Sequence, residues 1–543
     1  MLRRRQGTPN VASSPTHRNF DALLSLEGSA TLLLAALTVL MCVVFFALPA
    51  DDAYIVARYV QQLYEGNGLV FNPGERINAV TSPLLTLVQA VVYPLGHEPV
   101  DVYRVAAAVL TAWTLVAIAR RAYAAKSDGL LYLALTLASP FVCFWSVGGL
   151  ETPLLLCACS WLTWLALSPN PDDGRRRAVQ VIALATIAVL TRYDSVLYVA
   201  PVAALCLWRH ARDARVVGTA IVCAASVSAW MLFTYAYYGD VFPTPFYVKL
   251  SGNEGAGDAL RGAGYALSFG ILALVLPAAA LRLWKRRRLD EDRRAVLRML
   301  VLGAALETAY AVLAGDKHMM YAYRLFVPYL PSLILLLSNA GAAREAVAGG
   351  RAARVSWVIA ILGYQTLLGA CLYYLSENPN LSLAFRKQRV GDESYEFSTI
   401  GAKYTRSFLA AVRASAKEID AHWTAVAADK SRPMRIAVLT GGTLPYRLPR
   451  AYALESLVSY RHRCSANLAS FADYAQVVHN ADAPFSAAQL FGRGDGWELI
   501  SKHEITVNGL QRNPYHLRID IWYQEHPAPL IFPSRVDQPC IGA

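Results

Sequence analysis

The sequence predicts a polytopic α-helical membrane protein that carries a folded domain outside the membrane at its C-terminal end. Hydrophobic residues make up 55% of the 543 residues, whereas charged residues make up only 17%. Ordinary soluble domains contain about 25% charged residues, and the mean hydropathy of this chain is +0.33. This composition excludes a disordered chain, a collagen and an ordinary cytosolic enzyme.

The chain is basic, with 51 Lys and Arg residues against 39 Asp and Glu residues and a net charge of +12. In a soluble protein such a charge indicates a nucleic-acid partner. In a membrane protein it has a simpler origin, because Lys and Arg collect in cytoplasmic loops. We therefore expect the lipid bilayer as a partner, and no nucleic acid.

Apolar segments define the predicted spans, several of which are shorter than the roughly 20 residues of a full span. We predict about eleven spans, at 29–49, 102–119, 130–146, 151–168, 176–192, 195–208, 215–237, 264–283, 296–314, 322–338 and 354–375. The segment 79–95 is apolar too, but counting it would place the next basic clusters on alternating sides. We place it as an interfacial or re-entrant helix on the outer side.

Basic clusters fix the orientation of these spans, because they fall on one side, which the positive-inside rule assigns to the cytoplasm. The clusters are Arg3 to Arg5; Arg120, Arg121 and Lys126; Arg175 to Arg177; Arg209, Arg212 and Arg215; Lys285 to Arg288; and Arg344, Arg351 and Arg354. The N-terminus is then cytoplasmic. The first apolar run is too long for a signal peptide, and Leu48 is too large for the cleavage motif, so we predict an uncleaved span.

The predicted organisation has three parts: a cytoplasmic arm at 1–28, a transmembrane domain at 29–375 that includes a first outer loop at 51–101, and an extracytoplasmic soluble domain at 376–543. The last part lacks long apolar runs. Helical periodicity at 397–428 and a buried strand at 434–440 predict a small α/β or α+β domain there.

The cysteines give little chemistry, because the nine of them show no metal-ligand spacing. Seven lie in apolar segments, where cysteine is mostly a small hydrophobic residue. Cys464 and Cys540 lie in the C-terminal domain, and they are candidates for one disulfide if that domain is exported.

Polar residues that interrupt the apolar sequence all fall on the predicted outer face, although only the Lys and Arg loops fixed that face. They are Asp51, Asp52, Glu151, Arg192, Asp194, Asp240, Lys249, Asp316, Lys317, His318 and Arg324. Ionisable groups at the membrane are costly and indicate a functional site. For a single carboxylate, capping of a helix N-terminus is an equally ordinary role.

The richest stretch runs from Asp51 to Arg76. Residues 53–64 have helical character, and a helix places Asp51, Tyr54 and Arg58 on one face. An aspartate is suited to general-base chemistry and an arginine to phosphate binding. The alternative for Arg58 is an ion pair with an acidic neighbour.

Two later stretches carry cations beside aromatic residues. Two prolines forbid a regular helix in 237–250, so Lys249 lies in a shaped loop and could contact a phosphate. In 314–331, Arg324 begins a membrane helix, so its charge must reach the interface, a phosphate or a carboxylate. His318 could bind a metal, but no ligand spacing supports this.

These segments resemble a known family. The stretch from Asp51 to Arg76, with TSPLL at 81–85, resembles the first outer loop of the GT-C polyprenyl-phosphate-sugar glycosyltransferases. It is most similar to the terminal β-arabinofuranosyltransferase branch. The segments GGLETPL, LTRYDS, YYGDVFPTPFYVKL and GDKHMMYAYRLFVPYLP are similar to later blocks of that branch, in the same order.

The resemblance implies a GT-C fold and transfer of a sugar, in this branch D-arabinofuranose, from a polyprenyl phosphate to a hydroxyl of a cell-envelope glycan or glycoprotein. It implies a multi-pass protein of the bacterial inner membrane. The catalytic aspartate of the family corresponds to Asp51 or Asp52; we predict Asp51 as the base, with Asp52 positioning the acceptor or a metal. Donor-phosphate contacts correspond to Arg58, Lys249 and Arg324.

The remaining outer residues are expected to line the substrate site. They are Tyr54, Glu151, Arg192, Asp194, Asp240, Asp316, Lys317 and His318. A single base implies inversion, with cationic groups stabilising the departing phosphate. The sequence requires no cofactor, and a divalent metal stays open because some GT-C enzymes use one. Thr244 stands where the family pattern has an asparagine, which could alter the sugar contacts.

Three other functions compete with this interpretation. A hexose or mannose transferase of the same fold differs only in its sugar. A lipid-linked glycan flippase or transporter would carry charges within its spans, whereas these spans are nearly free of charge. A non-catalytic membrane scaffold would leave the polar residues between Asp51 and Arg76 unexplained.

Overall fold

The computed structural model describes most of the chain outside several loops and the N-terminal arm. The described residues are 26–96, 98–123, 126–168, 174–246, 256–284, 291–313, 321–339, 351–372, 388–390, 393–395, 402–427, 432–438, 441–454, 472–480, 497–507, 515–525 and 527. The predicted disulfide candidates Cys464 and Cys540 lie outside these residues.

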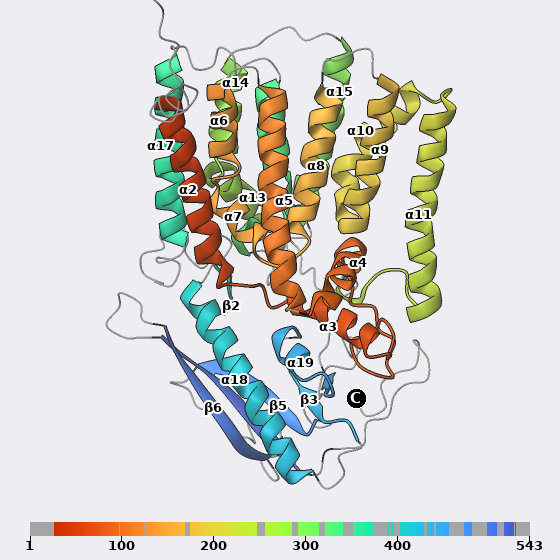
Figure 1. Ribbon diagram of the computed structural model, residues 1–543, viewed down its shortest axis with the longest axis vertical. Helices are drawn as coiled ribbons and strands as arrows, with labels where there is room; N and C mark the ends of the chain where they lie inside the picture. Colours follow the sequence, from red (N-terminus) through yellow and green to blue (C-terminus); the bar gives the residue numbers. More distant parts are fainter. Residues whose placement is uncertain are drawn as a thin grey trace, which may run out of the picture.

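Long helices run side by side to form the larger part of the molecule (Figure 1). They are α2 (Leu26–Phe46), α5 (Pro99–Ala122), α6 (Lys126–Leu135), α7 (Pro140–Ser146), α8 (Thr152–Leu167), α9 (Gly174–Thr191), α10 (Val196–Arg209), α11 (Ala214–Tyr238), α13 (Ala256–Leu272), α14 (Val275–Trp284), α15 (Glu291–Leu313), α16 (Leu330–Asn339) and α17 (Arg351–Ala370). Ten of the eleven predicted spans fall on one of these helices or on two consecutive ones. In the span 322–338 only the part from Leu330 is α-helical, so the prediction that Arg324 begins a helix is wrong: it lies in a turn between short 3-10 segments.

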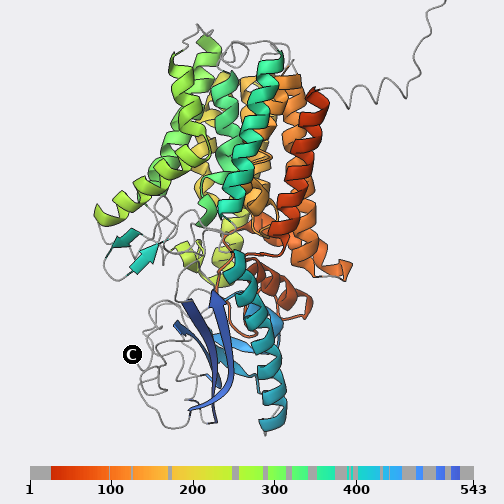
Figure 2. The same ribbon diagram turned by 90° about the vertical axis from the view of Figure 1, so that its left-hand side faces the viewer.

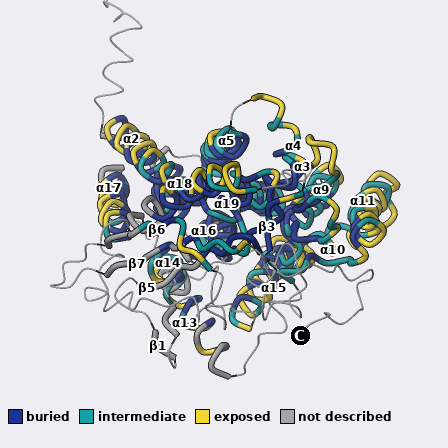
Figure 3. The backbone as a smooth tube through the Cα atoms, turned by 90° about the horizontal axis from the view of Figure 1, so that it is seen from below, coloured by how far each residue is buried: buried dark blue, intermediate teal, exposed yellow. Residues whose placement is uncertain are grey.

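Among the described residues, five helices are long and apolar enough to cross a membrane, or six if α6 and α7, bent by 67°, form one span. Four further apolar helices of 10–17 residues, α8 among them, are shorter. Large apolar side chains on α2 and α11, such as Val43 and Leu232, are exposed, and these two helices lie at the rim of the bundle (Figure 3). The protein is therefore a helical membrane protein, whereas the larger number of eleven spans stays a prediction.

Basic residues gather at one end of the bundle. Arg175 at the start of α9 pairs with Asp213, at 2.6 Å, and Arg209 at the end of α10 pairs with Asp292, at 3.2 Å. The opposite end of the bundle contacts the C-terminal part through Glu98, before α5, which pairs with Arg447 at 2.7 Å. The described basic clusters and the C-terminal part thus lie at opposite ends (Figure 1).

The C-terminal part contains a mixed sheet covered on one face by α18 (Ala402–Val426) (Figure 2). The strand order is β4 (Tyr452–Leu454), β3 (Arg435–Ala437), β5 (Tyr474–Asn480), β7 (Tyr515–Gln524) and β6 (Trp497–Val507). Strand β3 pairs in parallel with β4 and β5, whereas β7 pairs antiparallel with β5 and β6. A short hairpin, β1 (Gln388–Val390) and β2 (Glu393–Tyr395), precedes α18.

The predicted helix at 397–428 corresponds to α18, and the predicted strand at 434–440 contains β3. Val412, Ala416 and Ile419 recur along α18 at helical spacing and pack with Ile436 and Ile521 of the sheet. This periodic apolar face explains why α18 forms as a long amphipathic helix on the sheet.

The first outer loop lies between the bundle and the sheet (Figure 1). It contains α3 (Ala53–Tyr64) and α4 (Pro83–Val92), and α3 contacts the short helix α19 (Thr443–Arg447). Tyr59 and Phe71 of this loop share a core with α18 and the sheet, whereas Tyr446 of α19 joins the core of the bundle. The loop therefore packs against the C-terminal part, and one C-terminal side chain, Tyr446, packs into the helical bundle.

Candidate active site

The chain between α2 and α3 brings two adjacent aspartates to the end of the bundle. The N–H of Ala50 donates to the carbonyl of Gly148 at 2.9 Å, which places Asp51 and Asp52 beside the turn before α8. The two carboxylates then face different partners. Asp52 contacts a guanidinium from the bundle, whereas Asp51 contacts backbone N–H groups of the C-terminal part.

Five charged residues predicted from sequence form one group, which we call the charged cluster: Asp52, Glu151, Arg192, Asp194 and Arg324. Arg324 Nη1 lies 3.3 Å from Asp52 Oδ2, and its Nη2 lies 3.2 Å from Glu151 Oε1. Arg192 Nε lies 4.0 Å from Glu151 Oε1 and also pairs with Asp194. Three carboxylates therefore surround two guanidinium groups.

The charged cluster is mostly buried but keeps an opening at Asp52. The Glu151 side chain is 4% exposed and that of Arg324 14%, whereas the Asp52 side chain is 23% exposed. Arg324 thus has carboxylates on two sides, and the Asp52 carboxylate can be reached from solvent. Charge pairs of this burial interact more strongly than those in water.

Two unusual backbone segments position the charged cluster. Gly149 has φ of +93°, and a Cβ there would lie only 2.8 Å from the Cβ of Ala53, so the approach of α3 requires glycine. Ala322 and Tyr323, before Arg324, both have positive φ, of 48° and 55°. Trp145 Nε1 donates to the carbonyl of Ala322 at 2.9 Å. Such strained residues gather at functional sites.

Glu307 extends the charged cluster and was missed by the sequence analysis. It lies in α15, is 2% exposed, and is near Asp194, Arg192 and Tyr329. Both of its carboxyl oxygens lack a hydrogen-bond partner among the described residues, as do Arg192 Nη1 and the Tyr329 hydroxyl. The available signal was the single carboxylate in the segment 296–314, whose only other charged residue, Arg298, lies near its start. The prediction that the spans are nearly free of charge is wrong at this position.

Asp51 accepts hydrogen bonds from two consecutive backbone groups at the start of α19. The N–H of Gly442 lies 3.1 Å from Oδ2, and the N–H of Thr443 lies 2.8 Å from Oδ1. A Cβ at Gly442 would collide with the carbonyl of Asp51 and lie 2.6 Å from Oδ2. Burial raises the pKa of Asp51, although the hydrogen bonds from Thr443 and Gly442 oppose that rise.

Arg58 is fully buried beside this contact. Its Nε donates to the carbonyl of Phe71 at 2.8 Å, its Nη2 to that of Ala451 at 2.5 Å, and its Nη1 to those of Pro445 and Leu448. Burial lowers the pKa of Arg58 to about 9. Because four carbonyls occupy the guanidinium, the geometry favours a role in holding the C-terminal part over a contact with donor phosphate.

The other predicted residues are placed apart from these contacts or are not described. Tyr54 is buried; its hydroxyl accepts a hydrogen bond from Arg413 at 3.3 Å, and its ring packs on Tyr446. Asp240 is partly exposed in the turn after α11. Outside the described residues lie Lys249, Asp316, Lys317 and His318. In the described part, no group of three His, Cys, Asp or Glu residues could hold a metal ion.

Two known proteins resemble this chain, whereas no family model matches it. The chain is 26% identical over 328 residues to a terminal β-(1→2)-arabinofuranosyltransferase of Corynebacterium glutamicum, an alignment that covers 53% of this chain and 46% of that protein. It is 29% identical over 269 residues to a protein of the same name from Mycobacterium tuberculosis, covering 44% and 41%. The chain thus spans less than half the length of the curated relatives it matches. The resemblance inferred from the sequence is confirmed.

Proposed function

We propose that this protein is an inverting glycosyltransferase that transfers D-arabinofuranose from a polyprenyl phosphate to a hydroxyl group of a cell-envelope glycan or glycoprotein. The observation that carries the proposal is that Arg324 contacts two carboxylates, Asp52 just before α3 and Glu151 just before α8. These residues lie in the sequence blocks that resemble the terminal arabinofuranosyltransferases. The names of the two relatives support the choice of sugar.

In this proposal Arg324 binds the donor phosphate. Its guanidinium is held by two carboxylates when no substrate is bound, and a phosphate can compete with them because it accepts two parallel hydrogen bonds. As the bond between the anomeric carbon and the phosphate oxygen breaks, the electron pair leaves with the phosphate. Arg324 stabilises that developing charge.

Asp52 is the general base in this proposal. The acceptor oxygen forms a bond to the anomeric carbon on the face opposite the phosphate, and its proton passes to the Asp52 carboxylate. The transition state is oxocarbenium-like, as in glycoside hydrolysis. One displacement without a covalent intermediate inverts the configuration at the anomeric carbon.

The surroundings of the two aspartates support Asp52 over Asp51 as the base. One oxygen of Asp52 pairs with Arg324, and the side chain is partly exposed, so an acceptor hydroxyl can reach it. Both oxygens of Asp51 already accept backbone hydrogen bonds. We therefore propose Asp51 as the residue that holds α19 in place beside the base.

The proposed orientation has the N-terminus in the cytoplasm of a bacterial cell and the charged cluster on the outer face of the inner membrane, with about eleven spans in all. The gathering of basic residues at the end opposite the sheet supports it, because the positive-inside rule places such residues in the cytoplasm. The C-terminal part would then face the acceptor.

A second function is favoured by one observation. Glu307 and Arg192 place charges within the bundle, which is the feature that a transporter of lipid-linked glycans would require. Transport and transfer differ in their products, since only transfer breaks the bond between sugar and phosphate.

The test uses purified protein in vesicles with a labelled polyprenyl-phospho-arabinofuranose and a neutral arabinofuranose oligosaccharide as acceptor. Wild-type protein is expected to extend the acceptor, and Asp52→Asn is expected to lose about a hundredfold or more of that rate. Transfer from a mannose donor instead would overturn the choice of sugar. Movement of intact donor across the bilayer without any extended acceptor would favour transport.

A further inference from the structure

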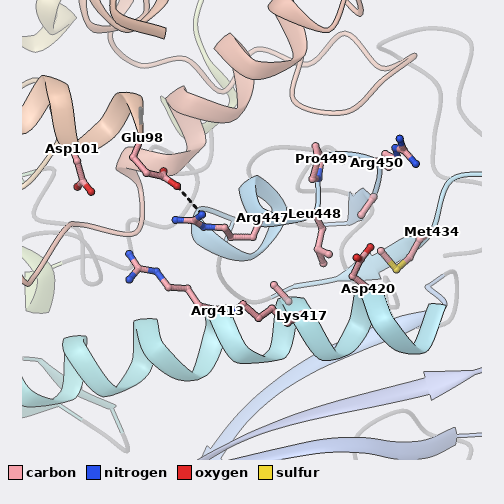
Figure 4. A pocket seen from close by; sticks show the side chains of 12 residues that line it. Glu98, Asp101, Arg413, Lys417, Asp420, Met434, Arg447, Leu448, Pro449 and Arg450 are labelled. Atoms are coloured by element: carbon pink, nitrogen blue, oxygen red, sulfur yellow. Dashed lines mark ion pairs between the residues drawn. The ribbon is translucent and has the colours of Figure 1, made fainter. Parts of the chain in front are cut away.

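A cavity of about 800 Å³ lies where the C-terminal part meets the start of α5, and no residue of the charged cluster lines it (Figure 4). Residues from four segments line it: Glu98 and Asp101 at the start of α5, Arg413, Lys417 and Asp420 on α18, Met434 before β3, and the loop from Arg447 to Ala451. Its size is within the range of sites that bind small molecules.

Some of the charged groups in this cavity are paired within the protein. Glu98 pairs with Arg447 at 2.7 Å, and Asp101 pairs with Arg104 at 2.6 Å. Figure 4 shows Arg413 and Arg447 extending toward the side of the cavity where Glu98 and Asp101 lie.

Other polar groups that line the cavity have no ion-pair or hydrogen-bond partner in the described part of the protein. Among the described residues, Lys417, Asp420 and Arg450 have no ion pair, and all three are exposed. Two deeper atoms, Glu98 Oε2 and Arg447 Nε, are buried without a hydrogen-bond partner in the described part. Buried polar atoms are almost always paired in proteins, with water or a ligand where the protein offers nothing.

The charged and apolar side chains that line the cavity indicate which class of ligand it can bind. An apolar ligand is excluded because it would strip water from unpaired charges. A phosphate would be attracted by the cationic side chains but repelled by the carboxylates of Glu98, Asp101 and Asp420, so the lining is not a dedicated anion site. A sugar hydroxyl both donates and accepts, so carboxylates and cationic groups can each serve it. Aliphatic side chains of Ala416, Met434 and Leu448 line the same cavity and suit the C–H faces of a sugar ring.

The cavity is also connected to the proposed active site through α3. Arg413, in the cavity wall, donates to the hydroxyl of Tyr54, which lies two residues after Asp52. The loop from Arg447 to Ala451 is held by Arg58, also on α3. One helix therefore contacts both the charged cluster and two walls of the cavity.

We propose that this cavity binds a neutral oligosaccharide segment of the acceptor, at a distance from the hydroxyl that reacts. The proposal rests on the proposed transferase function for the identity of the ligand as an acceptor, whereas the binding itself can be measured without any donor. Lys417 and Asp420 then contact hydroxyl groups of the sugar chain, and they determine affinity for the acceptor rather than the rate of the chemical step.

Binding is tested on the full chain in lipid nanodiscs, with a short neutral arabinofuranose oligosaccharide as probe and saturation-transfer NMR as readout. Asp420→Asn and Lys417→Ala are each expected to weaken binding about tenfold, the loss of one hydrogen bond to a charged group. Arg212→Ala, an exposed cation at the opposite end of the bundle, is the control and keeps wild-type affinity. Thermal melts of all variants show whether each folds.

Kinetics separate this proposal from the proposed function. If transfer is active, both variants raise KM for the acceptor and leave kcat and KM for the donor unchanged. If the wild type binds the oligosaccharide but no transfer occurs from any donor, the cavity proposal stands and the transferase function fails. Equal affinity of Asp420→Asn, Lys417→Ala and wild type overturns the cavity proposal, as does preferential binding of inorganic phosphate or of anionic lipid vesicles.

Discussion

Helix α3 and the residues before it make two contacts that differ in how completely their polar groups are satisfied. Toward the C-terminal part, Asp51 accepts from backbone N–H groups and Arg58 donates to backbone carbonyls, which we call the docking contact. Toward the bundle, Asp52 belongs to the charged cluster, where side chains meet side chains and several atoms near Glu307 stay unpartnered.

The difference indicates what each contact is for. Backbone groups do not move away, so the docking contact is complete without a ligand and stabilises the assembly of the two parts. Ion pairs among side chains can exchange partners, so the charged cluster can receive a substrate phosphate. In the proposed function, the adjacent residues Asp51 and Asp52 therefore have separate roles, in stability and in chemistry.

The largest expected effect is on the charged cluster. Arg324→Ala removes the proposed phosphate contact and is expected to lower the rate of transfer by about 10²–10³, the cost of losing one group that stabilises developing charge. Steady-state kinetics with labelled donor measure it. Arg324→Lys keeps the charge but loses the parallel hydrogen bonds, so it is expected to recover only part of the rate. Full activity of Arg324→Ala would remove this residue from the site.

Within the docking contact, substitution of Arg58 is expected to have the largest effect on stability. Arg58→Ala removes the guanidinium from four carbonyls, of which Pro445 and Leu448 keep backbone N–H donors, whereas Phe71 and Ala451 lose the donor that Arg58 supplies. We expect a loss of about 2 kcal/mol or more in stability, because each unsatisfied buried group costs about 1–3 kcal/mol. Thermal unfolding in detergent and limited proteolysis between the two parts measure it. A raised KM for donor with unchanged stability would instead support the phosphate contact predicted from sequence.

A smaller change at Gly442 tests the same contact from the other side. In Gly442→Ala the added methyl group collides with Asp51, and such overpacking costs about 1–3 kcal/mol. The matched control is Gly218→Ala on α11, where a Cβ meets no atom within 4 Å. We expect Gly442→Ala to lower the melting temperature and Gly218→Ala to leave it unchanged or raise it. Equal effects of the two substitutions would contradict the docking contact.

A pH dependence of stability is expected at the edge of the docking contact. Glu75 accepts hydrogen bonds from Asn72 and from Tyr452 of β4, and burial raises its pKa to about 8. Because the folded protein holds this proton more tightly than the unfolded chain, stability falls as pH rises between about 4.5 and 8. Melting temperatures from pH 5 to pH 9 measure the fall, which Glu75→Gln is expected to flatten. An unchanged pH profile in that variant would assign the dependence to other groups.

Much of the fold could be predicted from the sequence, because apolar periodicity is a local property. Ten of the eleven predicted segments coincide with α-helices, whereas 322–338 is α-helical only from Leu330, and Arg324 lies in a turn before that helix. The elements α18 and β3 were also predicted from their patterns. Membrane crossing by the shorter helices depends on tilt and packing, which no local pattern contains. Tyr59 packs in one core with residues of α18 that are far from it in the chain. This contact could not be predicted from either segment alone.

The sequence predicted most of the residues of the candidate site, but it did not predict which partners they contact. Of the polar residues predicted on one face, the structure brings Asp52, Glu151, Arg192, Asp194 and Arg324 together. Helical spacing also grouped Asp51 with Arg58, but their partners come from residues 442–451, so spacing within α3 could not assign their role. Glu307 was overlooked because one carboxylate hardly changes the hydropathy of a span.

In the proposed function, Asp52 performs the chemistry while Asp51 holds the C-terminal part. The most direct test compares Asp52→Asn with Asp51→Asn in one transfer assay, alongside donor binding and thermal unfolding. The account predicts that Asp52→Asn loses transfer by about 10²–10⁴ while it still binds donor and keeps its melting temperature. Asp51→Asn is predicted to lower the melting temperature and keep a larger share of its activity. The reverse pattern, with transfer abolished only in a stable Asp51→Asn protein, would contradict it.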